Sequence, residues 1–256
     1  MKSFYKINHC RICGSRNLKK IIDLKKQYIQ GSFIKKNNPK PYLKKIPLML
    51  ILCKNCSLVQ LSHTVNKEIL YKNYWYESGI NLTMQTHLKE ITTTGSYLLK
   101  KKDDIKVLDI GCNDGTLLSF YPKKFQKYGI DPSQIVKKIN KKKINVINDF
   151  FPPQKKNIIT KLKFDLITSI AMFYDLQNPN VFVKKIKTHL EKNGIWIFEL
   201  SYLIDMLKLN SFDTICHEHL EYYSIHSLDF LLKKHKLKIF NISRNAINGG
   251  SIRCFV

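Results

Sequence analysis

The sequence has no apolar run long enough to cross a lipid bilayer. Its longest, Ile46–Leu52, is much shorter than the about 20 residues of a spanning helix. The opening residues, MKSFYKINHC, lack the apolar core of a secretory signal peptide. Seven cysteines, an odd number, in a chain without an export signal favour reduced thiols. We therefore expect a cytoplasmic protein with no membrane partner.

Arginine and acidic residues are both scarce. The net charge is +25, with 44 Lys+Arg against 19 Asp+Glu, yet only four of the basic residues are arginines. Because proteins that recognise nucleic acids rely on the bidentate fork of arginine, we do not expect a nucleic-acid partner. Residues 1–62 carry 14 basic residues and a single acid, which suits attraction of a small anionic ligand.

The chain lacks the GxGxxG spacing of dinucleotide sites and the GK[ST] of a phosphate-binding loop. Instead, an apolar strand at 105–110 runs into a turn and then a helix. The candidate cofactor-binding residues of this turn are Asp109, Gly111, Asn113 and Gly115. Glycine lets a ligand approach the backbone, and Asp131, after the next strand, can accept hydrogen bonds from both ribose hydroxyls. The pattern predicts a nucleoside site and resembles the S-adenosylmethionine site of class I methyltransferases.

Two Cys-x-x-Cys pairs lie in the first quarter of the chain. They consist of Cys10, Cys13, Cys53 and Cys56. Such a spacing lets both sulfurs of a pair face one tetrahedral ion, and two pairs complete a closed four-thiolate site. We expect a structural Zn²⁺ with no open position for catalysis. His9 is then a neighbour rather than a ligand.

From Asp104 onward, strands and helices alternate, which indicates a parallel sheet covered by helices. The predicted strands are 105–110, 126–130, 144–147, 164–169, 194–200, 237–243 and 251–256. The fold class is therefore α/β, a class I methyltransferase (Rossmann-like) seven-stranded sheet preceded by a small zinc-binding module. We expect this module at 1–62, a helical connector or active-site lid at 63–100, and the cofactor-binding domain at 101–256.

Ligands of doubly wound sheets bind beyond the carboxyl ends of the strands. After the third predicted strand, Asp149 is placed to bond the adenine amino group and Phe150 to stack on its ring. After the fourth, Ala171 and Met172 form a wall beside the cofactor.

The densest polar cluster follows the fifth predicted strand. It contains His217, Glu218 and His219. If this HEH stretch is extended, the two histidines face one side and Glu218 the other. A histidine titrates near neutrality and is a natural general base. A metal-binding histidine pair is the rival interpretation, but it lacks the HExxH spacing and an evident third ligand.

The chain resembles the sugar C-methyltransferases of deoxysugar biosynthesis. The matching segments are the cysteine pairs, LYKNYWYESG (70–79), VLDIGCNDGTLL, GIDPS, FDTICHEHLEYYS (212–224) and NGGSIR (248–253). The resemblance implies that His219 is the base, that Glu218 contributes to the site, and that Tyr76 lies near the substrate. Some members have a tyrosine where this chain has Cys216. The sequence given has no segment that matches the family's third, C-terminal domain, and we therefore expect an acceptor that differs from the family's or is held by another subunit.

The sequence therefore predicts an S-adenosylmethionine-dependent methyltransferase that acts on a small anionic acceptor. A nucleotide-activated sugar or a surface-polysaccharide precursor is expected, methylated on carbon or oxygen. The alternative from another class is a zinc-ribbon RNA methyltransferase or nucleic-acid-binding protein, whose binding would weaken steeply with salt. A third reading is an inactive partner subunit, which the complete HEH cluster disfavours.

Overall fold

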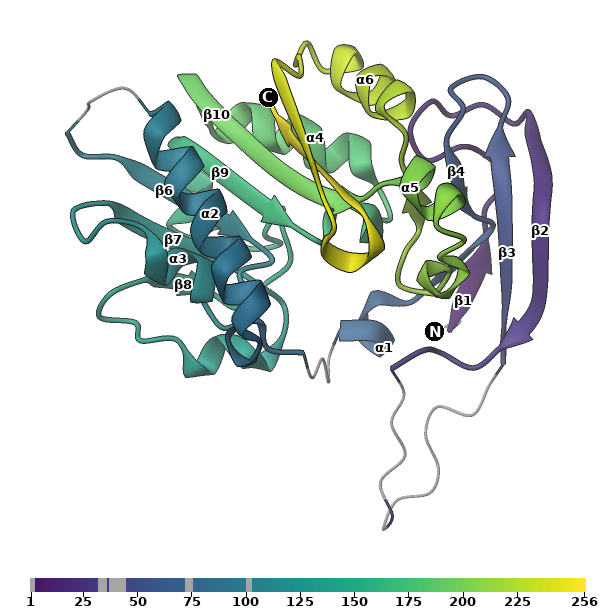
Figure 1. The fold of residues 1–256 in the computed structure, drawn as a ribbon, viewed down its shortest axis with the longest axis horizontal. Helices are drawn as coiled ribbons and strands as arrows, with labels where there is room; N and C mark the ends of the chain where they lie inside the picture. Colours follow the sequence, from purple (N-terminus) through teal and green to yellow (C-terminus); the bar gives the residue numbers. More distant parts are fainter. Residues whose placement is uncertain (1–2, 32–35, 37–44, 72–75, 100–102) are drawn as a thin grey trace.

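The computed structural model describes residues 3–31, 36, 45–71, 76–99 and 103–256. The chain forms a large central sheet covered by helices and a smaller sheet built mainly from the N-terminal residues (Figure 1). The lysine-rich segment 35–45, which the sequence favours as an exposed loop, lies outside the described residues except for 36 and 45. Within the described part, no helix has both the length and the apolar character needed to cross a membrane.

The large sheet has seven strands in the order β12-β13-β10-β9-β6-β7-β8. The strands are β6 (Lys106–Ile110), β7 (Gln126–Ile130), β8 (Asn145–Ile147), β9 (Phe164–Ile170), β10 (Leu190–Ser201), β12 (Asn241–Asn245) and β13 (Ser251–Phe255). Strands β8, β7, β6, β9 and β10 run parallel, whereas β13 is antiparallel to both β10 and β12. The predicted seven-stranded sheet is thus confirmed, and its last two strands form an antiparallel pair.

One strand begins later than the sequence predicts. The expected strand at 237–243 is observed at Asn241–Asn245. Leu237 and Ile239 pack against the core from an unpaired segment. Their apolar character therefore reflects packing rather than strand pairing.

Four helices pack on this sheet: α2 (Leu82–Leu98), α3 (Thr116–Phe120), α4 (Pro179–His189) and α6 (Ile225–Lys234). Helices α1 (Lys67–Tyr71) and α5 (Leu203–Lys208) instead pack against residues of the N-terminal part. Helix α2 begins at Asn81, whose side chain accepts hydrogen bonds from the amides of Thr83 and Met84. Its buried face shares a core cluster with Leu166 and Ile197 of the sheet. Helices α4 and α6 belong to a second cluster with Trp196.

Short 3₁₀ helices occur in the connections. They are η1 (Ser78–Ile80), η2 (Gln134–Lys138), η3 (Ile159–Lys161), η4 (Phe173–Asp175), η5 (Phe212–Thr214) and η6 (Ile247–Gly249). Within the segment expected as a helical connector, 63–100, the structure has α1 at 67–71 and α2 at 82–98, and residues 72–75 and 100 lie outside the described part.

The N-terminal part has more sheet than the sequence indicates. Strand β1 (Phe4–Lys6) pairs with β5 (His63–Val65), and a four-stranded sheet has the order β11-β4-β3-β2. Its strands are β2 (Leu18–Gln27), β3 (Ile46–Cys53), β4 (Val59–Leu61) and β11 (Glu221–Tyr222). Because β11 comes from a late part of the chain, this sheet joins segments more than 150 residues apart, with Glu221 opposite Gln60.

Candidate functional site

The structure brings the four N-terminal cysteines together. All their sulfur atoms lie within 4.8 Å of one another, with Cys10 Sγ 3.5 Å from Cys56 Sγ and Cys13 Sγ 3.4 Å from Cys53 Sγ. These separations exclude disulfides, whose S–S bond is about 2.05 Å. A tetrahedral Zn²⁺ with Zn–S bonds of about 2.3 Å places its sulfurs about 3.8 Å apart. The residues present therefore fit a closed, structural zinc site.

A cavity of about 710 Å³ opens at the carboxyl ends of the parallel strands. Its wall includes the ends of β6, β7 and β9, the start of α2, and His219 of the HEH stretch. Ligand pockets typically measure about 300–1,000 Å³. This cavity can therefore hold a nucleoside cofactor together with part of an acceptor.

The glycine-containing turn after β6 forms one wall. Gly111 has a φ of +75°, and a Cβ there would lie 3.1 Å from Met172 Cγ. A larger residue at this position would strain the backbone and crowd the cavity. Asp109, also in the wall, accepts a 2.6 Å hydrogen bond from Thr168, and burial raises its pKa to about 7.

Asp131 lies at the end of β7, against the same turn. Its Oδ2 accepts a 2.9 Å hydrogen bond from the Asn113 amide, and its Oδ1 accepts from the amide and hydroxyl of Ser133. Asp131 and Asn113 line the cavity together with Gly111. The structure thus places Asp131, Asn113 and Gly111 side by side, as a ribose-binding wall requires. Gly115, with a φ of +79°, instead caps α3 and packs close to Ile139.

The segment before α2 is attached directly to this turn. Asn113 donates from Nδ2 to the Tyr76 carbonyl and accepts from the Ser78 amide, while the Gly79 amide donates to Asp114 Oδ2 at 2.7 Å. Tyr76 lines the cavity, and burial raises the pKa of its phenol. The connector therefore covers the cofactor turn and brings Tyr76 to the site.

The other predicted wall residues separate into two groups. Phe150, Ala171 and Met172 line the cavity. Asp149 does not, because its carboxylate accepts hydrogen bonds from the Phe150 and Gln154 amides. Asp149 thus stabilises its own loop, and the structure does not place it for the predicted contact with adenine.

His219 lies in the cavity wall with one ring nitrogen already bonded. Its Nδ1 is 2.7 Å from the Thr214 carbonyl oxygen, so Nδ1 carries the proton and Nε2 keeps its lone pair. The ring is edge-on to Tyr174, with ring centroids 4.5 Å apart. Burial lowers the pKa of His219. A neutral, oriented imidazole of this kind can accept a proton.

The HEH stretch is bent rather than extended, so its two histidines diverge. His217 is buried outside the cavity wall, with Nδ1 2.9 Å from Gln30 Oε1 and Nε2 3.2 Å from the Ile46 carbonyl oxygen. The expectation that His217 and His219 share a face is wrong, since tertiary contacts with the N-terminal sheet turn His217 away. Ligand atoms of Cys216, Glu218 and His219, not the histidine pair, lie within 4.8 Å of one another. Burial raises the pKa of Glu218 to about 6.

One acid of the site was not identified from the sequence as a functional residue. Asp175, at the end of η4, lines the cavity and is deeply buried. Burial, with the charges of Glu218 and Glu221, raises its pKa well above the ordinary range. The sequence does place Asp175 shortly after β9, beyond the wall residues Ala171 and Met172. That position could have identified Asp175 as a residue of the site.

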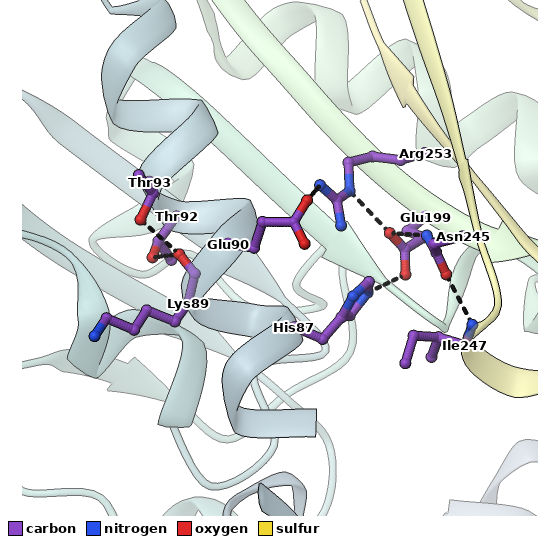
Figure 2. Close-up of polar contacts among 9 residues, drawn as sticks. All are labelled: His87, Lys89, Glu90, Thr92, Thr93, Glu199, Asn245, Ile247 and Arg253. Carbon is purple, nitrogen blue, oxygen red and sulfur yellow. Dashed lines mark hydrogen bonds and ion pairs between the residues drawn. The ribbon is translucent and has the colours of Figure 1, made fainter. Parts of the chain in front are cut away.

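A network of polar and charged side chains centred on the buried Glu199 joins α2 to the sheet (Figure 2). Glu199 of β10 accepts hydrogen bonds from His87 Nε2 at 2.5 Å, Asn245 Nδ2 at 3.0 Å and Arg253 Nε at 2.9 Å. Arg253 also donates to Glu90 of α2 at 3.0 Å. This network joins α2, whose first turns line the cavity, to three adjacent strands of the sheet.

A seven-stranded sheet with a terminal antiparallel pair, a glycine turn after β6 and an acid after β7 define a class I methyltransferase fold. Family comparisons agree: a profile of the methyltransferase domain family matches residues 84–241, and a profile of a zinc-binding domain family matches residues 10–71. The chain belongs to this methyltransferase family.

Individual relatives are distant. The chain is 24% identical over 253 residues to the C-methyltransferase NovU of Streptomyces niveus, covering 97% of this chain and 60% of NovU. It therefore spans about three fifths of the length of that curated relative.

Solved structures show the same fold at low identity. An S-adenosylmethionine-dependent methyltransferase from Clostridium acetobutylicum has a TM-score of 0.52 at 16% identity, covering 67% of this chain and 90% of that one. The plantazolicin methyltransferase BpumL, in complex with SAH, has a TM-score of 0.52 at 15% identity, covering 66% and 81%.

The cavity residues fit S-adenosylmethionine, the cofactor of this fold. Asp131 would offer an acceptor to the ribose, Gly111 would permit close approach of the ligand, and Met172 and Phe150 would offer apolar surface. The cofactor would contribute a methyl group activated by its sulfonium centre. The protein must then bring an acceptor atom into line with that methyl group.

Proposed function

We propose that this chain catalyses methyl transfer from S-adenosylmethionine to a nucleotide-activated sugar or a surface-polysaccharide precursor. His219 is the general base, and Tyr76, in the cavity wall, contributes to acceptor binding. Glu218 is not one of the lining residues; it lies beside His219 and contributes to the site from there. The observation that carries this proposal is the His219 ring in the cavity wall, with Nδ1 bonded to Thr214 and Nε2 retaining its lone pair. The similarity to NovU supports a sugar as acceptor.

The base can act in two ways. For carbon methylation, His219 Nε2 takes a proton from a carbon next to a ketone, and the electron pair of that C–H bond becomes the nucleophile. For oxygen methylation, Nε2 takes a hydroxyl proton instead. In either case the new bond to the methyl carbon forms as its bond to sulfur breaks. A positioned general base typically contributes about 10²–10⁴-fold to the rate.

The acidic residues of the cavity wall favour binding of the uncharged sugar of such an acceptor inside the cavity, rather than of its phosphates. The described lining residues include Asp131 and Asp213, together with Asp109 and Asp175, whose pKa values burial raises, but one lysine, Lys67, and no arginine. Lys67 Nζ lies 3.6 Å from the centroid of the Phe150 ring. We therefore place the sugar ring inside, beside His219, and the phosphates near Lys67.

Methyl transfer to a panel of nucleotide sugars, followed with isotopically labelled S-adenosylmethionine, tests this function. We expect at least one nucleotide sugar to be methylated, and turnover to fall about 10²–10⁴-fold in His219→Asn. Methylation of RNA but of no sugar, with binding that weakens steeply as salt increases, would instead establish the nucleic-acid alternative. Near-normal turnover by His219→Asn would exclude His219 as the base.

A further inference from the structure

The segment that carries His219 is held largely by the N-terminal sheet. We call residues 215–220 the HEH loop; β11 follows it and pairs with β4, with Glu221 opposite Gln60. The Leu61 amide donates to the Leu220 carbonyl at 2.9 Å. Apolar residues of both parts form one cluster, which includes Leu48, Leu50, Val59, Leu61, Ile215, Leu220 and Tyr222.

Arg11, between two of the cysteines, reaches across this junction. It is 8% exposed, and its Nε lies 3.6 Å from Glu221 Oε1. Its guanidinium also donates to Gln60 Oε1 at 3.2 Å, to the Leu61 carbonyl at 2.6 Å and to Thr64 Oγ1 at 2.8 Å. The planar fork of arginine can make these contacts at once, and a lysine cannot. Arg11 thus fixes the β4 edge to which β11 is paired.

His217 holds the other end of the HEH loop. Its backbone amide and Nδ1 both contact Gln30 Oε1, at 3.3 and 2.9 Å, and its Nε2 contacts the Ile46 carbonyl oxygen. His217 is 1% exposed. Both ring nitrogens therefore face polar atoms of the N-terminal part, Gln30 just after β2 and Ile46 of β3, and not the cavity.

We infer that Arg11 and His217 are positioning residues, which set the place of His219 by fastening the HEH loop to the N-terminal sheet. On its other side the loop is anchored by the Leu220 amide, which donates to the Tyr174 carbonyl at 2.8 Å. The catalytic part of this inference rests on the proposed role of His219. The cofactor turn lies on other strands, so cofactor binding should be insensitive to both residues.

Arg11→Lys tests the inference, with Arg16→Lys as the matched control because Arg16 is an exposed arginine of the same module. A misplacement of about 1 Å can cost about 10²-fold in rate, so we expect kcat to fall about 10–100-fold in Arg11→Lys. S-adenosylhomocysteine affinity should stay within about twofold of wild type, since the turn is untouched. Equal kcat in the two variants would overturn the inference.

The second pair of variants is His217→Gln, with exposed His9→Gln as its control. If these residues act through His219, adding Arg11→Lys or His217→Gln to His219→Asn should lower the rate little further. A full additional loss in that background would show that they act elsewhere.

Hydrogen exchange supplies a readout that does not depend on the reaction. In Arg11→Lys, amides of residues 215–222 and 59–61 should exchange faster, whereas those of β7 should not change. If the wild-type protein methylates no acceptor, the proposed function is wrong. Hydrogen exchange still tests whether Arg11 positions the HEH loop. Unchanged exchange in the HEH loop would refute that role.

Discussion

Replacing Glu199 with glutamine should destabilise the protein strongly while keeping the size of the side chain. Glu199 is 3% exposed and is the shared partner of His87 and Arg253 (Figure 2). Glutamine leaves the Arg253 guanidinium buried, with Glu90 as its remaining acidic partner. Removing one member of a buried ion pair typically costs about 3–5 kcal/mol, because the other charge is left uncompensated.

The expected change is large enough for thermal unfolding followed by circular dichroism. At about 2–4 °C per kcal/mol for a chain of this size, Glu199→Gln should lower Tm by about 6–20 °C. Glu90→Gln is the matched control, since its side chain is 66% exposed and it contacts the same arginine. An exposed ion pair is worth about 0–1 kcal/mol, so the control should lower Tm by less than about 4 °C.

The pH dependence provides an independent check. Burial alone would raise the pKa of Glu199, but the hydrogen bond and charge of His87, together with Arg253, hold it below its ordinary value of 4.5. Its contribution should therefore be present above pH 4.5 and be lost as the pH falls through the lowered pKa. If Glu199→Gln and Glu90→Gln have the same Tm at neutral pH, the network does not carry the stability assigned to it.

Three further outcomes follow from the site. Cys53→Ser should reduce bound zinc from about one ion per chain to none and unfold the N-terminal module, since structural zinc sites contribute about 10–16 kcal/mol to folding. Elemental analysis measures the zinc, and circular dichroism measures the unfolding. Asp131→Ala should weaken S-adenosylhomocysteine binding by about 1.5–3 kcal/mol, and unchanged affinity by calorimetry would contradict its role. Burial lowers the pKa of His219 below its ordinary value of 6.5, so kcat should stay level as the pH falls to 6.5 and decline only below it. A decline in kcat that begins well above pH 6.5 would count against His219 as the base.

Features that depend on residues close together in the sequence could be predicted from the sequence. The turn after β6 and Asp131 after β7 follow apolar strands directly, and the parallel order of those strands brings both to one edge. The cysteine pairs have a spacing that itself specifies a tetrahedral site. The sheet, the zinc module and the family were therefore correctly predicted, whereas the catalytic roles of Tyr76, Glu218 and His219 stay predictions.

The tertiary structure alone decided which neighbours diverge and which distant residues meet. His217 and His219 are two positions apart, yet contacts with Gln30 and Ile46 turn one away from the cavity that the other lines. Likewise, Glu221 pairs with Gln60 of the N-terminal sheet. Local periodicity carries no information about such contacts, because they depend on how complete elements pack and on which buried polar groups still need partners. The sequence by itself thus determined the fold and the cofactor edge, and packing between the two sheets determined where the candidate base stands.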